Sequence, residues 1–394
     1  MAERVFVHIG APKSGTTYLQ TLLWSNKEKL ADAGVLMPGN GKFDHNRAAQ
    51  AVRLRAPEPQ SKRTWQQLLR EVHDWPGTAV LSNEWFSMAS ETQARRAIGA
   101  FAPSEVHVVA TARDLVRVVP SAWQETVKLG TAQPLSDFIS SLDISKSRWR
   151  WSTLDPALAL SRWQASLPGR RVHLVTVAPA SEDRSLLWQR FATVCGIDAE
   201  GLDLDAGRTN ESIGAESARL LQLVGPRLRE AIDVDNSAWN NTYRWIRDYV
   251  SHDLLVPRGG SPIGMGSHEL KALRERSQQS IAQLAAGGYD VVGDLDELVG
   301  ADVPGGAVHP DNVSDAVVLD LAQDVMAALL GRVRDESRRA DQESQRAVSL
   351  QQTARAAEEA LARTTTRPTS MPGMLRAGIR RARRIVGQHS STGV

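Results

Sequence analysis

The stretch RVFVHIGAPKSGTTYLQTLL, residues 4–23, decides the fold prediction. It begins with an apolar run typical of a buried strand, continues through a loop bounded by Gly10 and Gly15, and ends in a helical pattern. A strand, a glycine-bounded loop and a helix form the layout of a phosphate-binding loop. In the nucleoside-triphosphate version a lysine follows the second glycine, but here Thr16 stands there and the lysine is Lys13. The stretch therefore predicts an anion-binding loop of a different kind.

The composition is that of a globular protein with no bulk charge. The chain has 394 residues, of which 42% are hydrophobic and 23% charged, and its net charge is +2. No nucleic-acid partner is expected from this balance. Its single cysteine, Cys195, excludes an internal disulfide. Neither a signal peptide nor an apolar run of about 18 residues is found, so a cytoplasmic protein is expected.

Strand-like and helical patterns alternate through the first half of the chain. Apolar runs at 78–86 (TAVLSNEWF), 105–114 (EVHVVATARD) and 170–177 (RRVHLVTV) predict three further strands, whereas residues 37–50 look irregular. Such alternation predicts an α/β fold: a three-layer α/β/α domain with a central, mainly parallel sheet. Ligands in these folds bind at the carboxyl ends of the strands.

Two segments are expected to follow a domain formed by residues 1–300. Residues 301–363 begin with a linker rich in proline and glycine and continue as a helix with a heptad-like stripe of small and apolar residues. That stripe would allow self-association, or it is one face of a lone charged helix, since Glu336 and Glu343 interrupt it. Residues 364–394 carry six arginines and no acid, and are expected to be disordered or to form an amphipathic helix on anionic lipid, making the protein peripheral to a membrane.

The loop sequence GAPKSGTTYLQ resembles the 5′-phosphosulfate-binding loop of sulfotransferases that use 3′-phosphoadenosine 5′-phosphosulfate (PAPS). The displaced lysine is the distinguishing feature of that loop. The resemblance implies that Lys13 reaches the oxygen that bridges phosphate and sulfate. It also implies that the loop and the start of the next helix hold the 5′ end of PAPS, through Pro12, Lys13, Ser14, Gly15, Thr16 and Thr17. Tyr18 departs from the family, in which many members have tryptophan.

The position of the lysine has a physical account in sulfuryl transfer. The bridging oxygen gains negative charge only as its bond to sulfur breaks, so one ammonium there stabilises the transition state more than the ground state. A sulfuryl group carries less charge than the β and γ phosphates that Mg²⁺ neutralises in phosphoryl transfer. No metal is therefore expected in this site.

A second anion site is expected for the 3′-phosphate of PAPS. The stretch TARDLVRVVPSAW places Arg113 at the end of a predicted strand and Ser121 eight residues later. The family's 3′-phosphate motif has an arginine and a serine at this spacing, so the resemblance extends to both residues. Arginine suits a phosphate because its planar fork can bind two oxygens at once. Arg117 is either a further contact or a solvated helix residue.

An acceptor hydroxyl needs a base, and two residues are candidates. The resemblance implies a glutamate or a histidine just past the second strand, where Glu84 stands; the alternative is a carboxylate that caps a helix or forms a salt bridge. His45 is the rival base or an acceptor contact. His8 and His107 lie inside predicted strands and are interpreted as core residues.

The resemblance therefore implies a PAPS-dependent sulfotransferase that acts on a hydroxyl or amine by in-line transfer. The acceptor is expected to be a small molecule, a carbohydrate or a glycolipid. Tryptophans such as Trp149 could stack on a sugar or lipid surface, although scattered tryptophans are more often packing residues. One alternative is a P-loop kinase or NTPase, which would need lysine after Gly15 and an acidic magnesium ligand. The other is a scaffold that binds a nucleotide without catalysis.

Overall fold

The structure is a computed structural model. It describes residues 1–144, 146–165, 167–179, 183, 185–205, 212–232, 238–300 and 302–365. The chain divides into two compact units, Met1–Ala322 and Gln323–Val394. The basic tail was predicted at residues 364–394, of which residues 366–394 lie outside the described residues, so its membrane contact stays a prediction.

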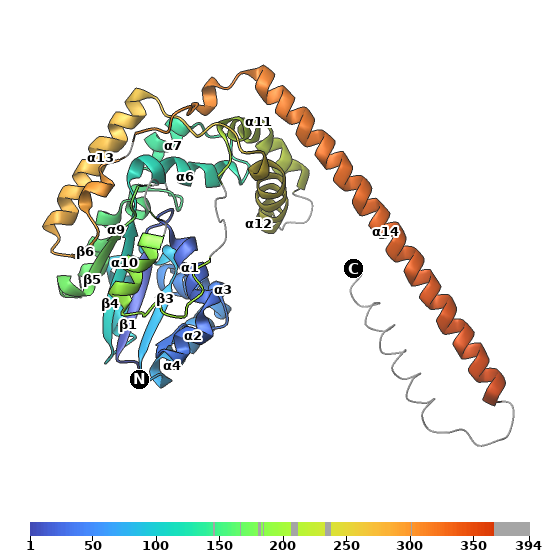
Figure 1. The fold of residues 1–394 in the computed structure, drawn as a ribbon, viewed down its shortest axis with the longest axis horizontal. Helices are drawn as coiled ribbons and strands as arrows, with labels where there is room; N and C mark the ends of the chain where they lie inside the picture. The colour runs from blue at the N-terminus through green and yellow to red at the C-terminus, as the bar shows by residue number, and fades with distance from the viewer. Residues whose placement is uncertain are drawn as a thin grey trace. The chain divides into compact units, whose positions relative to one another are not determined.

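A six-stranded, all-parallel sheet forms the centre of the first unit (Figure 1). The strands are β1 (Arg4–Gly10), β2 (Val35–Leu36), β3 (Thr78–Ser82), β4 (Glu105–Ala112), β5 (Val172–Thr176) and β6 (Asp290–Val292). Their order in the sheet is β2-β3-β1-β4-β5-β6. The connection after β1 leads towards β2, whereas that after β4 leads the other way, to β5. The carboxyl ends of β1 and β4 therefore flank the point at which ligands bind in such sheets.

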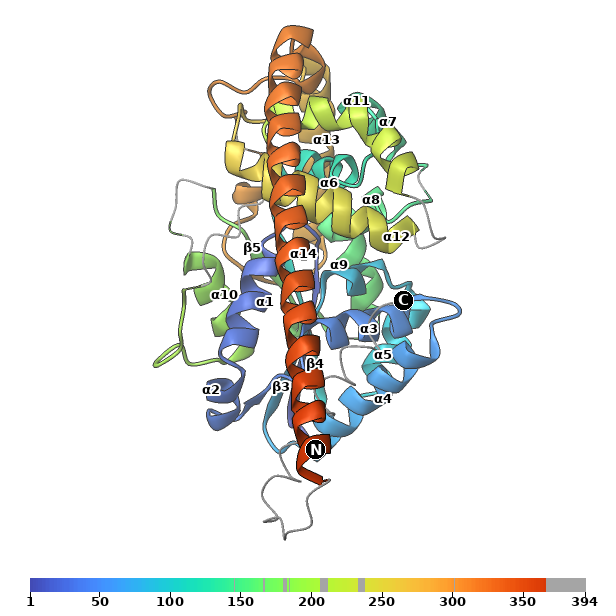
Figure 2. The same ribbon diagram turned by 90° about the vertical axis from the view of Figure 1, so that its right-hand side faces the viewer.

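Helices cover both faces of the sheet, which gives the expected three layers (Figure 2). Apolar side chains on one face pack with α3 (Lys42–Arg53), α4 (Pro59–Asp74), α5 (Glu91–Gly99) and α9 (Pro156–Gln164). On the other face they pack with α1 (Thr16–Ser25), α2 (Lys27–Asp32) and α10 (Ser185–Cys195). Cys195 is buried in this second layer, where burial raises the pKa of its thiol. The strands read as apolar runs because both faces are covered.

The remaining helices of the first unit lie in the connections from β4 to β5 and from β5 to β6. They are α6 (Leu115–Val127), α7 (Leu135–Ser141), α8 (Trp151–Leu154), α11 (Ala215–Ile232), α12 (Ala238–Asn241), a π-helix (Thr242–Leu255) and α13 (Ser267–Ala286). Short 3-10 helices cover Glu84–Met88, Gly169–Arg171, Val256–Arg258, Leu295–Leu298 and Pro310–Asn312. Asp114 begins α6 by accepting the backbone N–H of Arg117 at 2.9 Å.

The structure corrects the prediction for residues 37–50. Helix α3 begins at Lys42, immediately after a short glycine-containing turn, and is not irregular. Its buried residues are His45, Ala48, Ala49 and Val52, which share one face at helical spacing. The small size of the alanines makes this apolar face easy to overlook in a sequence.

The predicted linker after residue 300 belongs to the compact unit. Val308 donates its N–H to the Pro262 carbonyl at 2.9 Å and accepts the N–H of Gly264 at 2.8 Å. Asp311 also forms an ion pair with Arg219 at 3.5 Å. The compact unit that includes these residues ends at Ala322. The domain boundary expected at residue 300 stays a prediction.

Helix α14 (Asp315–Thr365) is a continuous helix of 51 residues. Leu330, Val333 and Leu350 are exposed along it, with exposed fractions of 65–70%. Self-association through the predicted heptad stripe stays a prediction. Across the part of the chain that the structure describes, no helix is both long enough and apolar enough to cross a membrane.

Candidate functional site

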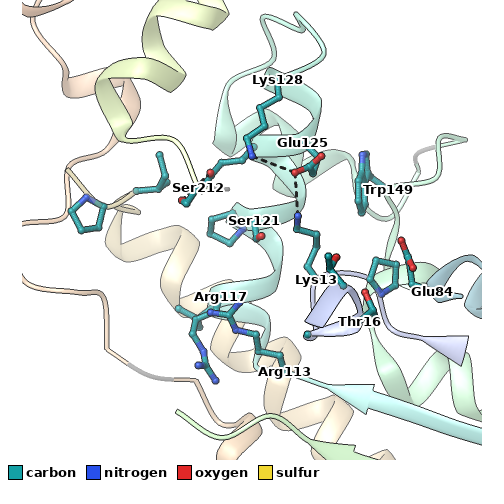
Figure 3. Close-up of a pocket in the computed structure, with 18 of the residues that line it drawn as sticks. Lys13, Thr16, Glu84, Arg113, Arg117, Ser121, Glu125, Lys128, Trp149 and Ser212 are labelled. Carbon is teal, nitrogen blue, oxygen red and sulfur yellow. Dashed lines mark hydrogen bonds and ion pairs between the residues drawn. The ribbon is translucent and has the colours of Figure 1, made fainter. Parts of the chain in front are cut away.

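A cleft of about 650 Å³ opens at the carboxyl ends of the strands, between the loop after β1 and helix α6 (Figure 3). Its volume lies within the usual range for small-molecule sites. The predicted site residues that line it are Pro12, Lys13, Gly15, Thr16, Thr17, Glu84, Arg113 and Ser121. The structure thus brings together residues that the sequence separates by more than a hundred positions.

Two glycines allow the loop to take its shape. Gly10 and Gly15 have φ angles of +96° and +83°, in a region that side-chain-bearing residues rarely adopt. A Cβ on Gly10 would lie 2.9 Å from the Glu84 Cα, and one on Gly15 would lie 2.3 Å from the Leu187 Cδ2. Lys13, at the crown of the loop, also has a positive φ of +65°. The glycines therefore permit both the turn and the close approach of Glu84.

A buried chain of polar side chains supports the loop from below. The Ser14 hydroxyl contacts the Ala11 carbonyl and the Thr111 hydroxyl, the latter at 2.7 Å. Thr111 lies 3.3 Å from the Nε2 of His8, whose Nδ1 lies 2.7 Å from the Ser82 hydroxyl. Burial lowers the pKa of His8 to about 3, so its ring is neutral at pH 7. His8 is a core residue, as expected. The Ser14 side chain is buried against Thr111 and does not line the cleft.

Arg113 and Ser121 form the second expected part of the site. Arg113 follows β4, and burial, together with the charge of Arg117, lowers the pKa of its guanidinium to about 10. Its Nε atom is buried and has no hydrogen-bond partner. Arg117 lines the same cleft and is paired with the buried carboxylate of Asp114. A buried donor without a partner, beside a second guanidinium, fits the oxygens of a phosphate.

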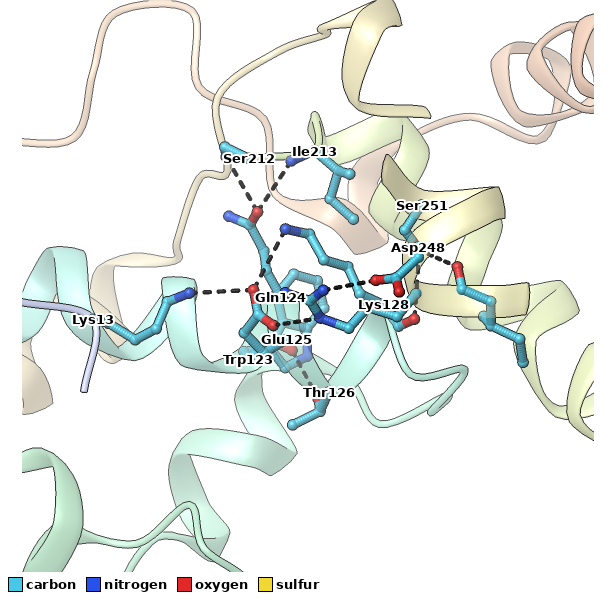
Figure 4. A network of polar contacts seen from close by, with 12 residues as sticks. Lys13, Trp123, Gln124, Glu125, Thr126, Lys128, Ser212, Ile213, Asp248 and Ser251 are labelled. Atoms are coloured by element: carbon cyan, nitrogen blue, oxygen red, sulfur yellow. Dashed lines mark hydrogen bonds and ion pairs between the residues drawn. The ribbon is translucent and has the colours of Figure 1, made fainter. Parts of the chain in front are cut away.

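The sequence prediction missed the carboxylate that contacts Lys13. The Lys13 ammonium donates to Glu125 Oε1 at 3.2 Å, and the same carboxylate is paired with Lys128 at 3.5 Å and Arg247 at 3.4 Å (Figure 4). Burial would raise the pKa of Glu125, but Lys13, Lys128 and Arg247 outweigh it and hold the pKa at about 2. Glu125 follows Ser121 by one helical turn, and this spacing is the signal that could have found it.

The segment before α11, which also lines the cleft, is hydrogen-bonded to Gln124 of α6. The Gln124 Oε1 accepts the Ser212 hydroxyl at 3.1 Å and the Ile213 backbone N–H at 3.2 Å. Ser212 lines the cleft, whereas the neighbouring Asn210 lies outside the described residues. The segment before α11 is therefore attached to the helix that carries Ser121.

Of the two candidate bases, only Glu84 lies at the cleft. It follows β3 in a 3-10 helix, and its Oε2 accepts a hydrogen bond from Gln20 at 3.0 Å. His45 is fully buried: its Nδ1 accepts the Ser82 N–H at 3.1 Å, and its Nε2 lies 2.9 Å from the Pro38 carbonyl. Burial lowers the pKa of His45 to about 4. With both ring nitrogens bonded to the backbone, His45 is not placed to accept a proton from a ligand in the cleft.

Aromatic side chains line the cleft beside Glu84. Trp85 and Trp149 meet edge to face with their ring centroids 5.7 Å apart, and the Arg148 guanidinium lies 5.0 and 5.1 Å from the two rings. Trp149 is itself only 5% exposed, and Trp123 and Trp163 are completely buried and belong to the packing. Flat rings next to a carboxylate can receive the face of a sugar or another ring.

No cluster of three or more metal-ligating side chains occurs among the residues that the structure describes. The cleft is rich in guanidinium and ammonium groups, which bind anions directly. Its chemistry is that of a site for a phosphate- or sulfate-bearing ligand.

Comparisons with known proteins give little further information. No protein-family model matches the chain, and no curated protein matches it. A sulfotransferase from Alicyclobacillus acidocaldarius is a solved structure that matches, with 14% sequence identity and a TM-score of 0.39. The match covers 61% of this chain and 100% of that one. An identity and a TM-score this low do not show that the two proteins share an activity.

Proposed function

We propose that this protein is a sulfotransferase that moves a sulfuryl group from PAPS to a hydroxyl or amine of an acceptor. One observation carries the proposal: Lys13, at the crown of a glycine-bounded loop, lines the same cleft as Arg113 and Ser121. A ligand with an anion at its 5′ end and another at its 3′ position would engage both groups. The buried Nε of Arg113 has no hydrogen-bond partner and could donate to an oxygen of such a ligand.

The proposed reaction gives roles to Lys13 and Glu84, both of which line the cleft. Glu84 takes the proton of the acceptor hydroxyl, and the acceptor oxygen attacks the sulfur atom. The bond between sulfur and the bridging oxygen breaks, and its electron pair stays on adenosine 3′,5′-bisphosphate. The Lys13 ammonium stabilises the charge that develops there, a contribution on the order of 3 kcal/mol to the barrier. No covalent intermediate with the protein is needed.

The acceptor is proposed to be a carbohydrate or glycolipid. The support is the pair Trp85 and Trp149 beside Glu84, because aromatic faces pack against the apolar face of a sugar ring. A small acceptor with a flat ring would use the same wall.

A P-loop kinase or NTPase is the weaker candidate. The residue after Gly15 is Thr16, whereas the loop of a kinase or NTPase has lysine at this position. The Lys13 ammonium contacts Glu125 of α6, as Figure 3 shows. A scaffold without catalysis would not need Glu84 to line the cleft.

A transfer assay tests the proposal. The purified protein is incubated with PAPS and sugar, glycolipid or phenolic acceptors, and adenosine 3′,5′-bisphosphate is measured together with the sulfated product. We expect transfer without added Mg²⁺, reduced at least about a hundredfold in Glu84→Gln. The matched control is Glu91→Gln, an exposed carboxylate on α5, which should be unaffected. Transfer that survives unchanged in Glu84→Gln would contradict the proposed base.

A further inference from the structure

The carboxylate of Glu125 joins three segments that are far apart in the sequence. Its Oε1 accepts from Lys13 of the anion loop and from Lys128, which follows it on the same helical stretch. Its Oε2 faces Arg247 of the π-helix at 3.4 Å. Figure 4 shows the carboxylate between Lys13 and Lys128. Lys13 is therefore held by a group that is itself fixed from two other sides.

The cleft geometry explains why Lys13 can reach this carboxylate. Ser121 and Glu125 lie one turn apart on α6, so both face the loop. Lys13 points across the cleft towards them, as Figure 3 shows. The left-handed backbone conformation of Lys13 sets the direction of its Cα–Cβ bond.

Glu125 is unsuited to proton transfer. Its pKa of about 2 leaves it ionised at every pH at which a protein of this kind works. The carboxylate is also 13% exposed, and Lys128 beside it is only 2% exposed. A partly buried carboxylate that stays ionised beside three cations can hold a cation but is a poor base for the proton of an acceptor.

We propose that Glu125 is a positioning residue that holds the Lys13 ammonium beside α6 until the sulfuryl donor enters, and then shares it with the bridging oxygen. An ammonium has three N–H donors, so it can contact a carboxylate and a ligand oxygen together. Lys128 and Arg247 keep Glu125 in place during this exchange. The identity of the ligand rests on the proposed function, whereas the positioning of the Lys13 ammonium by Glu125 does not.

Two opposite effects follow from removing the charge of Glu125. Lys13 loses the contact that orients it, so the rate of transfer falls. An anionic ligand, in contrast, no longer competes with Glu125 for the ammonium, so it binds more tightly. A residue with a merely structural role would not weaken turnover and strengthen binding at the same time.

The first experiment does not depend on the ligand. Lys13 acylation by acetic anhydride at fixed pH is followed by mass spectrometry, with the exposed Lys62 as the internal reference. In Glu125→Gln we expect Lys13 to react at least about threefold faster, because its nitrogen is no longer held in the ion pair against α6 and is more accessible to the reagent. The matched control is Asp302→Asn, which removes another acid of the cleft that is paired with Arg274. Equal rates in wild type and Glu125→Gln would overturn the proposal.

The second experiment measures how Lys13 and Glu125 are coupled. Calorimetric titrations with adenosine 3′,5′-bisphosphate are made on wild type, Lys13→Ala, Glu125→Gln and the double variant. We expect Glu125→Gln to tighten binding about tenfold when Lys13 is present, and less than about twofold when it is absent. The same factor in both backgrounds would overturn the proposal. If wild type does not bind the bisphosphate, the proposed function fails, and the acylation rates still decide the role of Glu125.

A third variant keeps the test valid if Glu125→Gln does not fold. Glu125→Asp retains the charge opposite Lys128 but shortens the side chain by one methylene. We expect it to melt near the wild-type temperature and still to raise the acylation rate of Lys13. An acylation rate equal to that of wild type in folded Glu125→Asp would count against the proposal.

Discussion

The two ends of the same strands carry ionisable groups in very different arrangements. At the amino end, His107 and His173 are bonded to each other at 2.8 Å, and their outer nitrogens meet Glu105 at 3.0 Å and Asp290 at 2.7 Å. Every ring nitrogen in this histidine chain has a partner. At the carboxyl end, three cations share Glu125, and the buried Nε of Arg113 has no partner.

The difference shows what distinguishes a binding site from a structural polar cluster. The histidine chain is satisfied by its own members, so it needs no ligand. The carboxyl end opens into a cleft and has donors that an anion would satisfy. Titratable residues alone would have suggested a site at either end.

The largest expected effect is that of Lys13→Ala. It should lower the rate of sulfuryl transfer at least about a hundredfold, corresponding to about 3 kcal/mol, because the developing charge on the bridging oxygen loses its ammonium. The melting temperature should change little, since Lys13 is partly exposed. Steady-state kinetics with PAPS and thermal melting measure the two quantities. Unchanged turnover would remove the assigned role of the loop lysine.

Arg113→Ala is expected to have the next largest effect, on binding. Loss of charge-assisted hydrogen bonds costs about 1.5–3 kcal/mol, so the bisphosphate should bind about ten- to a hundredfold more weakly. The affinity for adenosine 5′-monophosphate, which lacks the 3′-phosphate, should change far less. Calorimetry on both ligands separates the two cases, and an equal loss for both would show that Arg113 does not recognise the 3′ group.

Stability should fall as the pH is lowered from about 6.5 to 5. The pKa values of His8 and His45 fall from 6.5 to about 3 and about 4 in the folded protein, because both rings are buried. In this window the unfolded chain binds protons that the folded chain does not, so the free energy of unfolding decreases by up to about 1.4 kcal/mol per pH unit for each histidine.

Urea unfolding at several pH values measures this slope. The variant His45→Gln lacks one of the two groups and should show a shallower dependence, whatever its absolute stability. A free energy of unfolding that stays constant over this window would mean that these rings are not buried as neutral groups.

The smallest effect is expected at the amino end. His173→Asn removes hydrogen bonds to His107 and Asp290 and should lower the free energy of unfolding by about 1 kcal/mol. Binding of the bisphosphate should stay within about twofold, because the histidine chain lies at the far end of the strands. A large loss of bisphosphate binding in His173→Asn would show that the histidine chain at the amino end also contributes to the binding site.

The parts of the fold that depend on local sequence were predictable. The strands β1, β3, β4 and β5 are apolar runs, and the anion loop lies within one short stretch. The short strands β2 and β6 were not recognised as strands, because two or three residues give no periodic pattern. Helix α3 was missed because two of its four buried residues are alanines, which give only a weak apolar pattern in the sequence.

The site was predictable to the extent that spacing along the chain determines it. Arg113 and Ser121 follow β4 at an informative interval, and both line the cleft. The contact between Lys13 and Glu125 spans 112 positions, and Arg247 belongs to a helix with no sequence signal linking it to the loop. Such contacts depend on how the helices pack beyond the strand ends, which one sequence does not specify.

The most direct test of the central claim is a calorimetric titration of the wild-type protein with adenosine 3′,5′-bisphosphate, adenosine 5′-monophosphate and ATP with Mg²⁺. The account predicts micromolar binding of the bisphosphate, about tenfold weaker binding of the monophosphate, and no dependence on Mg²⁺. Tighter binding of ATP with Mg²⁺ would contradict it, because the cleft would then hold a triphosphate and the displaced lysine would have another role.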